Sequence, residues 1–196
     1  MPTGYSQLVM DVAPNDSLIA VGDALGRVDL WRSDGGHEKS LQARGMDISA
    51  IAFSAEGKQL AVCDRARQLK IWDCRTWQER LRIQIPADNE DLYPTSLVFS
   101  PDGKRLLLSQ GSIMGFVDVG TKTMLWDLSG ELDRNSNSKP QFTLDGSVIF
   151  VQGREPWIDA LTGTYHATLP KGVASHFGDK TVFTWGGDRL GRVLSP

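Results

Sequence analysis

The sequence has few of the residues that build metal, redox or disulfide sites. Its 196 residues include two cysteines and three histidines, and no pair of them has the His-x-His or Cys-x-x-Cys spacing of metal ligands. Cys63 belongs to one predicted strand and Cys74 follows the next, so a hairpin would hold them roughly 16 Å apart at ~3.3 Å per residue. A disulfide cannot span that distance. We therefore expect no metal, no cofactor and no disulfide.

Long apolar segments and a surplus of positive charge are also missing. No stretch approaches the ~18 apolar residues of a membrane span, and residues 1–12 lack the pattern of a signal peptide. The formal net charge is -3, whereas a nucleic-acid surface usually shows a strongly basic face. These features predict a cytoplasmic protein that binds neither membrane nor nucleic acid. We interpret the densest basic group, Arg65, Arg67 and Lys70, as a solvated rim.

Groups that could form an active site are equally sparse. His37, His166 and His176 fall in different parts of the chain, the first of them in a turn. The glycine clusters at 34–36 and 186–188 do not precede a helix, so they are interpreted as turns and not as phosphate-binding loops. No carboxylates are paired at a catalytic separation. The sequence predicts that the chain is not an enzyme.

What the sequence does contain is a short segment that nearly repeats about every forty residues. Ser54–Leu60 recurs as Ser100–Leu106, and a looser copy stands at Ala13–Ile19. Trp31 and Trp72 lie 41 residues apart, and the first two units align without gaps. A period in this range is typical of a repeat architecture.

Each unit has the pattern of four short strands separated by Gly, Asp, Asn or Pro. In the second unit these strands are expected at 48–53, 59–63, 68–73 and 79–85. Segments such as Leu106–Leu108 are apolar on both faces, as expected for sheets packed between neighbours. No segment has a helical period, so the chain is predicted to be all-β. The expected units are 5–45, 46–91, 92–137, 138–171 and 172–196, the last of them incomplete.

Two features of the turns have local physical reasons. A tight connection between antiparallel strands favours a residue that tolerates positive φ, and Asp or Asn can bond its own backbone. The connection between the first and second strands carries Gly57, Gly103 and Gly146 in three successive units. In the same three units an aspartate closes the third strand: Asp73, Asp118 and Asp159.

These residues resemble the WD-repeat β-propeller family. Ile48–Ala61 and Leu69–Asp73, which end in a Trp-Asp pair, carry the resemblance, and Trp31 and Leu97–Leu106 support it. It implies a propeller of four-stranded antiparallel blades. The repeats are divergent and bacterial-looking, and they amount to a partial propeller of about four and a half blades.

The sequence departs from the family pattern at several positions. Ala43 and Arg44 stand where the family has a Gly-His pair, and Val62 occupies a hydroxyl position. We therefore do not expect the family's buried polar network in the second unit. Val117 and Ile158 replace the third-strand tryptophan in later units. These replacements leave propellers of bacterial periplasmic or quinoprotein-like type as alternative relatives.

The number of units leaves three arrangements open. Members of this family typically close with about seven blades, and propellers in general with four to eight. The chain could be a fragment of a larger propeller, a five-bladed ring closed by its own N-terminal segment, or part of a ring completed by a second chain. Because an open arc leaves an apolar face bare at each end, the end blades could also self-associate or dock the missing blades.

The resemblance implies a non-enzymatic scaffold that binds a protein or peptide partner through its loop face. That face gathers the connections between the fourth and first strands and between the second and third. The candidate contact residues are Arg44, Met46, Arg65, Arg67, Asp91, Tyr93, Arg154 and Arg189. One alternative is an enzymatic or quinoprotein-like propeller with a central-channel site, although only Asp11 is charged on the inner strands. Another is a structural unit that completes a propeller with another chain.

Overall fold

The computed structural model describes most of the first two thirds of the chain and shorter stretches of the rest. The described residues are 8–14, 16–43, 46–86, 93–110, 113–127, 140–143, 145–151, 157–160, 162–163, 165–166, 174–177, 180–184 and 190–192.

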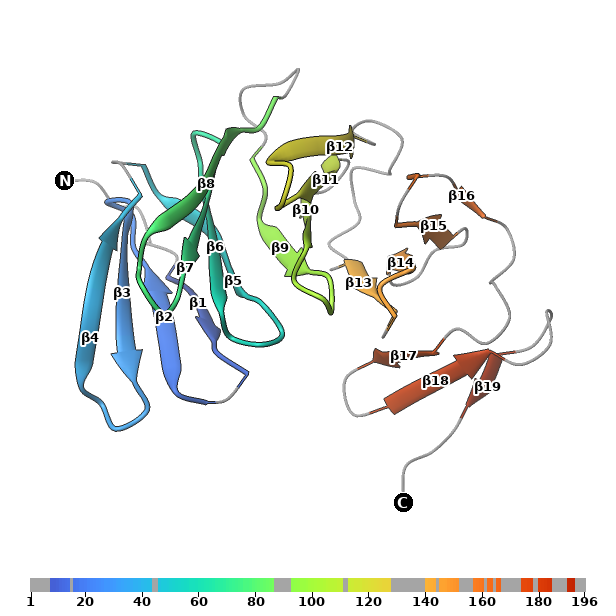
Figure 1. The fold of residues 1–196 in the computed structure, drawn as a ribbon, viewed down its shortest axis with the longest axis horizontal. Helices are drawn as coiled ribbons and strands as arrows, with labels where there is room; N and C mark the ends of the chain where they lie inside the picture. Colours follow the sequence, from blue (N-terminus) through green and yellow to red (C-terminus); the bar gives the residue numbers. More distant parts are fainter. Residues whose placement is uncertain are drawn as a thin grey trace.

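Five antiparallel sheets follow one another along these residues, and in each sheet the strands pair in chain order (Figure 1). Blade 1 contains β1 (Val9–Val12), β2 (Leu18–Gly22), β3 (Arg27–Arg32) and β4 (His37–Gln42). Blade 2 contains β5 (Ile48–Phe53), β6 (Gln59–Asp64), β7 (Gln68–Asp73) and β8 (Glu79–Gln84). Blade 3 contains β9 (Ser96–Phe99), β10 (Arg105–Gln110), β11 (Ile113–Asp118) and β12 (Thr123–Asp127). Blade 4 contains β13 (Pro140–Phe142), β14 (Val148–Val151), β15 (Trp157–Asp159) and β16 (Tyr165–His166), and the described part of blade 5 contains β17 (Ala174–Phe177), β18 (Lys180–Thr184) and β19 (Leu190–Arg192).

This architecture confirms the predicted fold class: the described residues form strands and turns, and no helix occurs among them. All four strands of the second unit begin where the pattern placed them. β5 and β7 also end at the expected residue, whereas β6 is longer by one residue and β8 is shorter by one. In the observed register Cys63 pairs with Leu69, and both cysteines are free thiols. The unit boundaries themselves stay a prediction.

The connection between the first two strands of each blade is built in the same way in blades 2, 3 and 4. A hydroxyl side chain accepts a hydrogen bond from the residue five positions later: Ser54 from Gln59, Ser100 from Arg105, and Thr143 from Val148. The turn glycines Gly57, Gly103 and Gly146 have φ of 65, 66 and 70°. The expected positive φ is therefore present at all three glycines, and it explains why the short segment repeats.

The blades pack face to face as an arc, which Figure 1 shows from blade 1 in blue to blade 4 in orange. Between blades 1 and 2, buried Val28 and Leu30 meet Leu60 and Trp72. A second cluster joins blade 2 to blade 3, and a third, around Phe116, joins blade 3 to blade 4. Each fully buried apolar side chain of this size contributes about 1.5–3 kcal/mol, so these clusters hold the blades together.

Two sequence-based interpretations were wrong. Lys70 is not part of a solvated rim, because its side chain is 2% exposed and is directed at blade 1. His37 is not in a turn: it is the first residue of β4, where its ring stacks edge-on against Trp31 with centroids 5.0 Å apart. In both cases a contact with a residue of another strand, which the local sequence pattern does not show, decides the outcome.

Candidate partner-binding face

Arg65 is the centre of a cluster on the loop face of blade 2. It lies in the turn between β6 and β7, and its guanidinium stands over the Tyr93 ring, 5.1 Å from the centroid. Its Nε lies 3.4 Å from Asp47 Oδ2, and its backbone N–H donates to the Asp47 carbonyl at 2.9 Å. Three separate connections therefore meet at one arginine: the one before β5, the β6–β7 turn, and the segment before β9.

The cluster is open to solvent. The side chains of Arg65 and Asp47 are 46% and 41% exposed, and Met46 is 49% exposed beside them. A cation over an aromatic ring at an exposed site is worth about 0.5–1 kcal/mol, enough to orient the guanidinium while leaving its other edge accessible. We call Met46, Asp47, Arg65 and Tyr93 the Arg65 cluster.

The turn that carries Arg65 is fixed by hydrogen bonds to its flanking strands. Asp64, which is buried, accepts a hydrogen bond from the Gln68 backbone N–H at 2.9 Å. Burial raises the pKa of the Asp64 carboxyl above its ordinary value, against the lowering effect of backbone hydrogen bonds from Gln68 and Ala66. The Gln84 side chain also donates to the Ala66 carbonyl at 2.7 Å. These contacts tie the turn to the outer strand β8.

Arg67 has a different role from Arg65. It is half-buried and adopts a left-handed conformation with a φ of 63°. Its backbone N–H donates to the Asp64 carbonyl, and its own carbonyl accepts from the Ile85 N–H, both at 2.9 Å. Arg67 therefore shapes the turn that presents Arg65.

The structure brings together some of the predicted contact residues and leaves others untested. Arg65 and Tyr93 are in contact, Met46 lies next in sequence to Asp47, and Arg67 belongs to the same turn. Sequence reasoning missed Asp47, although an acidic residue in the connection before β5 is a natural partner for a basic turn. The remaining predicted residues, Arg44, Asp91, Arg154 and Arg189, lie outside the described residues.

The inner strands carry one charged residue of interest, Asp11 on β1. Its Oδ2 accepts a hydrogen bond from the Phe53 backbone N–H at 2.7 Å. The carboxylate thus links the inner strand of blade 1 to that of blade 2. Among the residues that the structure describes, no three His, Cys, Asp or Glu side chains are grouped to hold a metal ion.

Residues 35–73, which run from the turn before β4 to the end of β7, match the family model "WD domain, G-beta repeat". The chain contains a WD40 repeat. The two residues of its Trp-Asp pair have different roles. Trp72 is buried against blade 1, and Asp73 accepts a hydrogen bond from the backbone of the turn after β7.

The fold is also similar to that of a solved structure, Kuenenia stuttgartiensis hydrazine synthase. The TM-score is 0.66 at 16% sequence identity, and the match covers 89% of this chain and 54% of that chain. The WD40-containing chain therefore spans about half the length of that protein, and a likeness at this identity shows the fold alone. No curated protein matches the chain. None of the described segments forms a helix that could cross a membrane.

The aspartate that ends the third strand caps the following turn in three blades. Oδ1 of Asp73, Asp118 and Asp159 accepts a hydrogen bond from the backbone N–H three residues later, at 2.9, 2.7 and 2.7 Å. That later residue is a threonine each time. The repeat pattern had marked the aspartates, and the spacing Asp-x-x-Thr is the signal that would have marked their partners as well. The Thr76 amide, together with the Arg80 guanidinium, lowers the pKa of Asp73 to about 2 against the opposing effect of burial.

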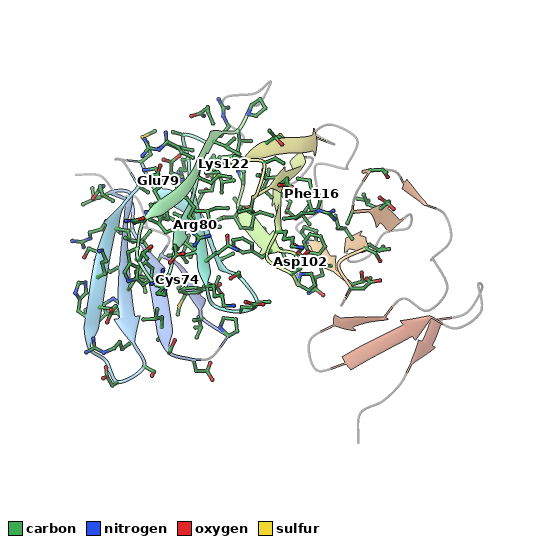
Figure 2. All side chains as sticks on the ribbon, viewed as in Figure 1. Cys74, Glu79, Arg80, Asp102, Phe116 and Lys122 are labelled. Carbon is green, nitrogen blue, oxygen red and sulfur yellow. The ribbon has the colours of Figure 1, made fainter. Side chains whose placement is uncertain are left out.

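Two open hollows flank Arg80. Figure 2 labels Cys74, Glu79, Arg80 and Lys122, each of which lines at least one of them. One, of about 550 Å³, lies between blades 2 and 3, and the other, of about 510 Å³, between blades 1 and 2. Arg80 lines both and pairs with Asp73. The hollows have basic rims, but Lys58 is paired with Glu56 and Lys104 with Asp102.

Proposed function

We propose that this chain is a non-enzymatic scaffold that holds a protein or peptide partner on its loop face, at the Arg65 cluster. The observation that carries the proposal is the meeting of Asp47, Arg65 and Tyr93 from three connections on a rigid sheet scaffold. Arginine, tyrosine and methionine are enriched in protein interfaces, and functional residues concentrate on loops held by such scaffolds.

The chemistry of the cluster suits a partner segment with a carboxylate beside an apolar side chain. An exposed ion pair is worth about 0–1 kcal/mol, so a partner carboxylate can replace Asp47 at Arg65 with little loss. Met46, which precedes Asp47 in the sequence and is exposed, offers an adaptable apolar side chain on the same connection.

The alternative function is an enzymatic propeller with a site in its central channel. The solved structure of similar fold is a hydrazine synthase by name, which favours this alternative. A channel site needs titratable groups from several blades directed inward. The Asp11 carboxylate is instead engaged by the Phe53 amide, so the scaffold remains the better supported function.

A photo-crosslinking residue at position 46 tests the proposal in cells of the source organism. We expect a discrete crosslinked partner that is lost in an Arg65→Glu variant and kept in a Lys58→Glu variant. Lys58 is the matched control because its side chain is 77% exposed on the opposite turn of the same blade. Crosslinks that persist in Arg65→Glu, or that form equally from position 58, would overturn the proposal.

A further inference from the structure

Blade 1 exposes an apolar face on the side away from blade 2. Met10, Val12 and Trp31 are 59%, 41% and 39% exposed. Their neighbours in the sheet register are Val21 and Ile19: Met10 pairs with Val21, and Val12 and Trp31 both pair with Ile19. We call Met10, Val12, Ile19, Val21, Asp29 and Trp31 the leading face of blade 1.

The corresponding face of blade 2 is buried. Because the first two units align at a spacing of 41 residues, Met10 corresponds to Ile51, Ile19 to Leu60, and Trp31 to Trp72. Ile51, Leu60 and Trp72 are 8%, 0% and 5% exposed and pack against blade 1. Blade 2 therefore shows what such a face does in this fold: the preceding blade packs on it.

One position on the two faces has the opposite charge. In blade 2, Lys70 Nζ donates to the Ala43 carbonyl at 3.0 Å and lies 3.5 Å from the Gln42 carbonyl, both in blade 1. The equivalent residue in blade 1 is Asp29, whose carboxylate accepts from Ser40 and lies 3.2 Å from Arg27 Nε. A carboxylate has no proton to donate to a carbonyl. Within blade 1, Ser40, Arg27 and His37 already offset the charge of Asp29 in part. A cation on the covering blade would add to this pairing, whereas a second carboxylate buried there would oppose it.

We propose that the leading face of blade 1 docks a four-stranded propeller blade from outside these 196 residues, with a lysine or arginine opposite Asp29. This surface is separate from the Arg65 cluster and does not depend on the function proposed there. It would extend the arc beyond blade 1.

Two other occupants fit less well. The contact at Lys70 comes from the end of β4, a fourth strand, whereas the described part of this chain's own blade 5 has three strands. A second copy meeting the face symmetrically would bring two Asp29 carboxylates onto one buried surface. An added blade fits the solved structure of similar fold, of which the match covers 54%.

Footprinting of the natural chain with hydroxyl radicals tests whether the face is free. We expect Met10 to react as fast as Met46, and Trp31 much faster than Trp72, at low and high protein concentration alike. Protection at every concentration would show that the chain covers the face itself. Protection only at high concentration would show a second copy. Either result would overturn the proposal.

An added blade then tests whether the face accepts a blade and whether a cation opposite Asp29 favours docking. Residues 8–48 are duplicated directly before residue 8, which keeps the 41-residue spacing, and the added copy carries Met10→Leu and Trp31→Phe so that footprints report the original face. We expect an added copy with Gln42→Arg to slow oxidation of the original Met10 and Trp31 by about tenfold, and more than an added copy with Gln42, because a cation opposite Asp29 adds a charge-assisted contact to those from Ser40 and Arg27. Asp29→Lys in the original blade should reverse that order.

Two results would contradict the proposal. Oxidation that is unchanged by every added copy would show that the face does not accept a blade. Equal protection with and without the charge pairing would show that Asp29 does not face the docked blade. Slow oxidation of Trp72 in each variant confirms that blades 1 and 2 have folded, so neither result can be ascribed to unfolding.

Discussion

The Asp11 carboxylate and the Phe53 backbone amide are joined by a 2.7 Å hydrogen bond that spans 42 residues of sequence. The bond runs between the inner strands of the first two blades, next to the apolar cluster that contains Phe53. One side chain thus satisfies a backbone donor of the neighbouring blade and fixes the spacing of the two sheets.

Replacing Asp11 with Ala should lower the free energy of unfolding by about 1–3 kcal/mol, because it leaves a partly buried amide without its acceptor. Asp11→Asn keeps an acceptor oxygen and should lose clearly less. Urea unfolding of the three proteins measures the difference. Equal losses for Ala and Asn would show that the charge and not the hydrogen bond matters, and no loss for Ala would mean that the bond is dispensable.

A methyl group at Gly22 should destabilise the contact between blades 1 and 2. A Cβ built there would lie 2.6 Å from Ile48 Cγ2 and 2.9 Å from Ile51 Cδ1. Such overpacking typically costs about 1–3 kcal/mol. We expect Gly22→Ala to lower the thermal midpoint, and the pair Gly22→Ala with Ile48→Ala to lose less than the sum of the single changes. If the losses of the two single changes simply add in the pair, the strain at position 22 does not come from Ile48.

The turn after β7 should make stability depend on pH at the acid end. The folded pKa of Asp73 is about 2, below its ordinary value of 3.8, because the Thr76 amide and the Arg80 guanidinium favour the ionised form. A lowered pKa contributes stability that is complete above about pH 4 and is lost as the pH falls towards 2. The urea midpoint of the natural chain should therefore exceed that of Asp73→Asn near neutral pH, and the gap should close between pH 4 and 2. A gap that stays constant down to pH 2 would rule out the carboxylate as its cause.

Most of the architecture could be predicted because it depends on local rules. Strand alternation placed β5 and β7 at their observed bounds, and the requirement for positive φ placed Gly57 and Gly103 in the turns. Each of these features is decided by residues close together in the chain, so a repeated local pattern is sufficient to specify it.

The candidate site was predictable only in part. The positions of Met46, Arg65 and Tyr93 on connections marked them as contact residues, but their spacing in sequence does not show that Arg65 meets Tyr93 and Asp47. That meeting depends on how blade 3 follows blade 2.

The sequence by itself determined the all-β repeat, its period and its turns, because strand alternation and turn conformation act over a few residues. The tertiary structure alone decided which polar groups meet. In the sequence Lys70 is one more member of a basic group, and it becomes a buried donor to Ala43 only because blade 1 packs over it. Whether a charge is solvated or buried depends on the neighbouring sheet, and the acceptors that blade 1 supplies to Lys70 lie 27 and 28 positions away in the sequence.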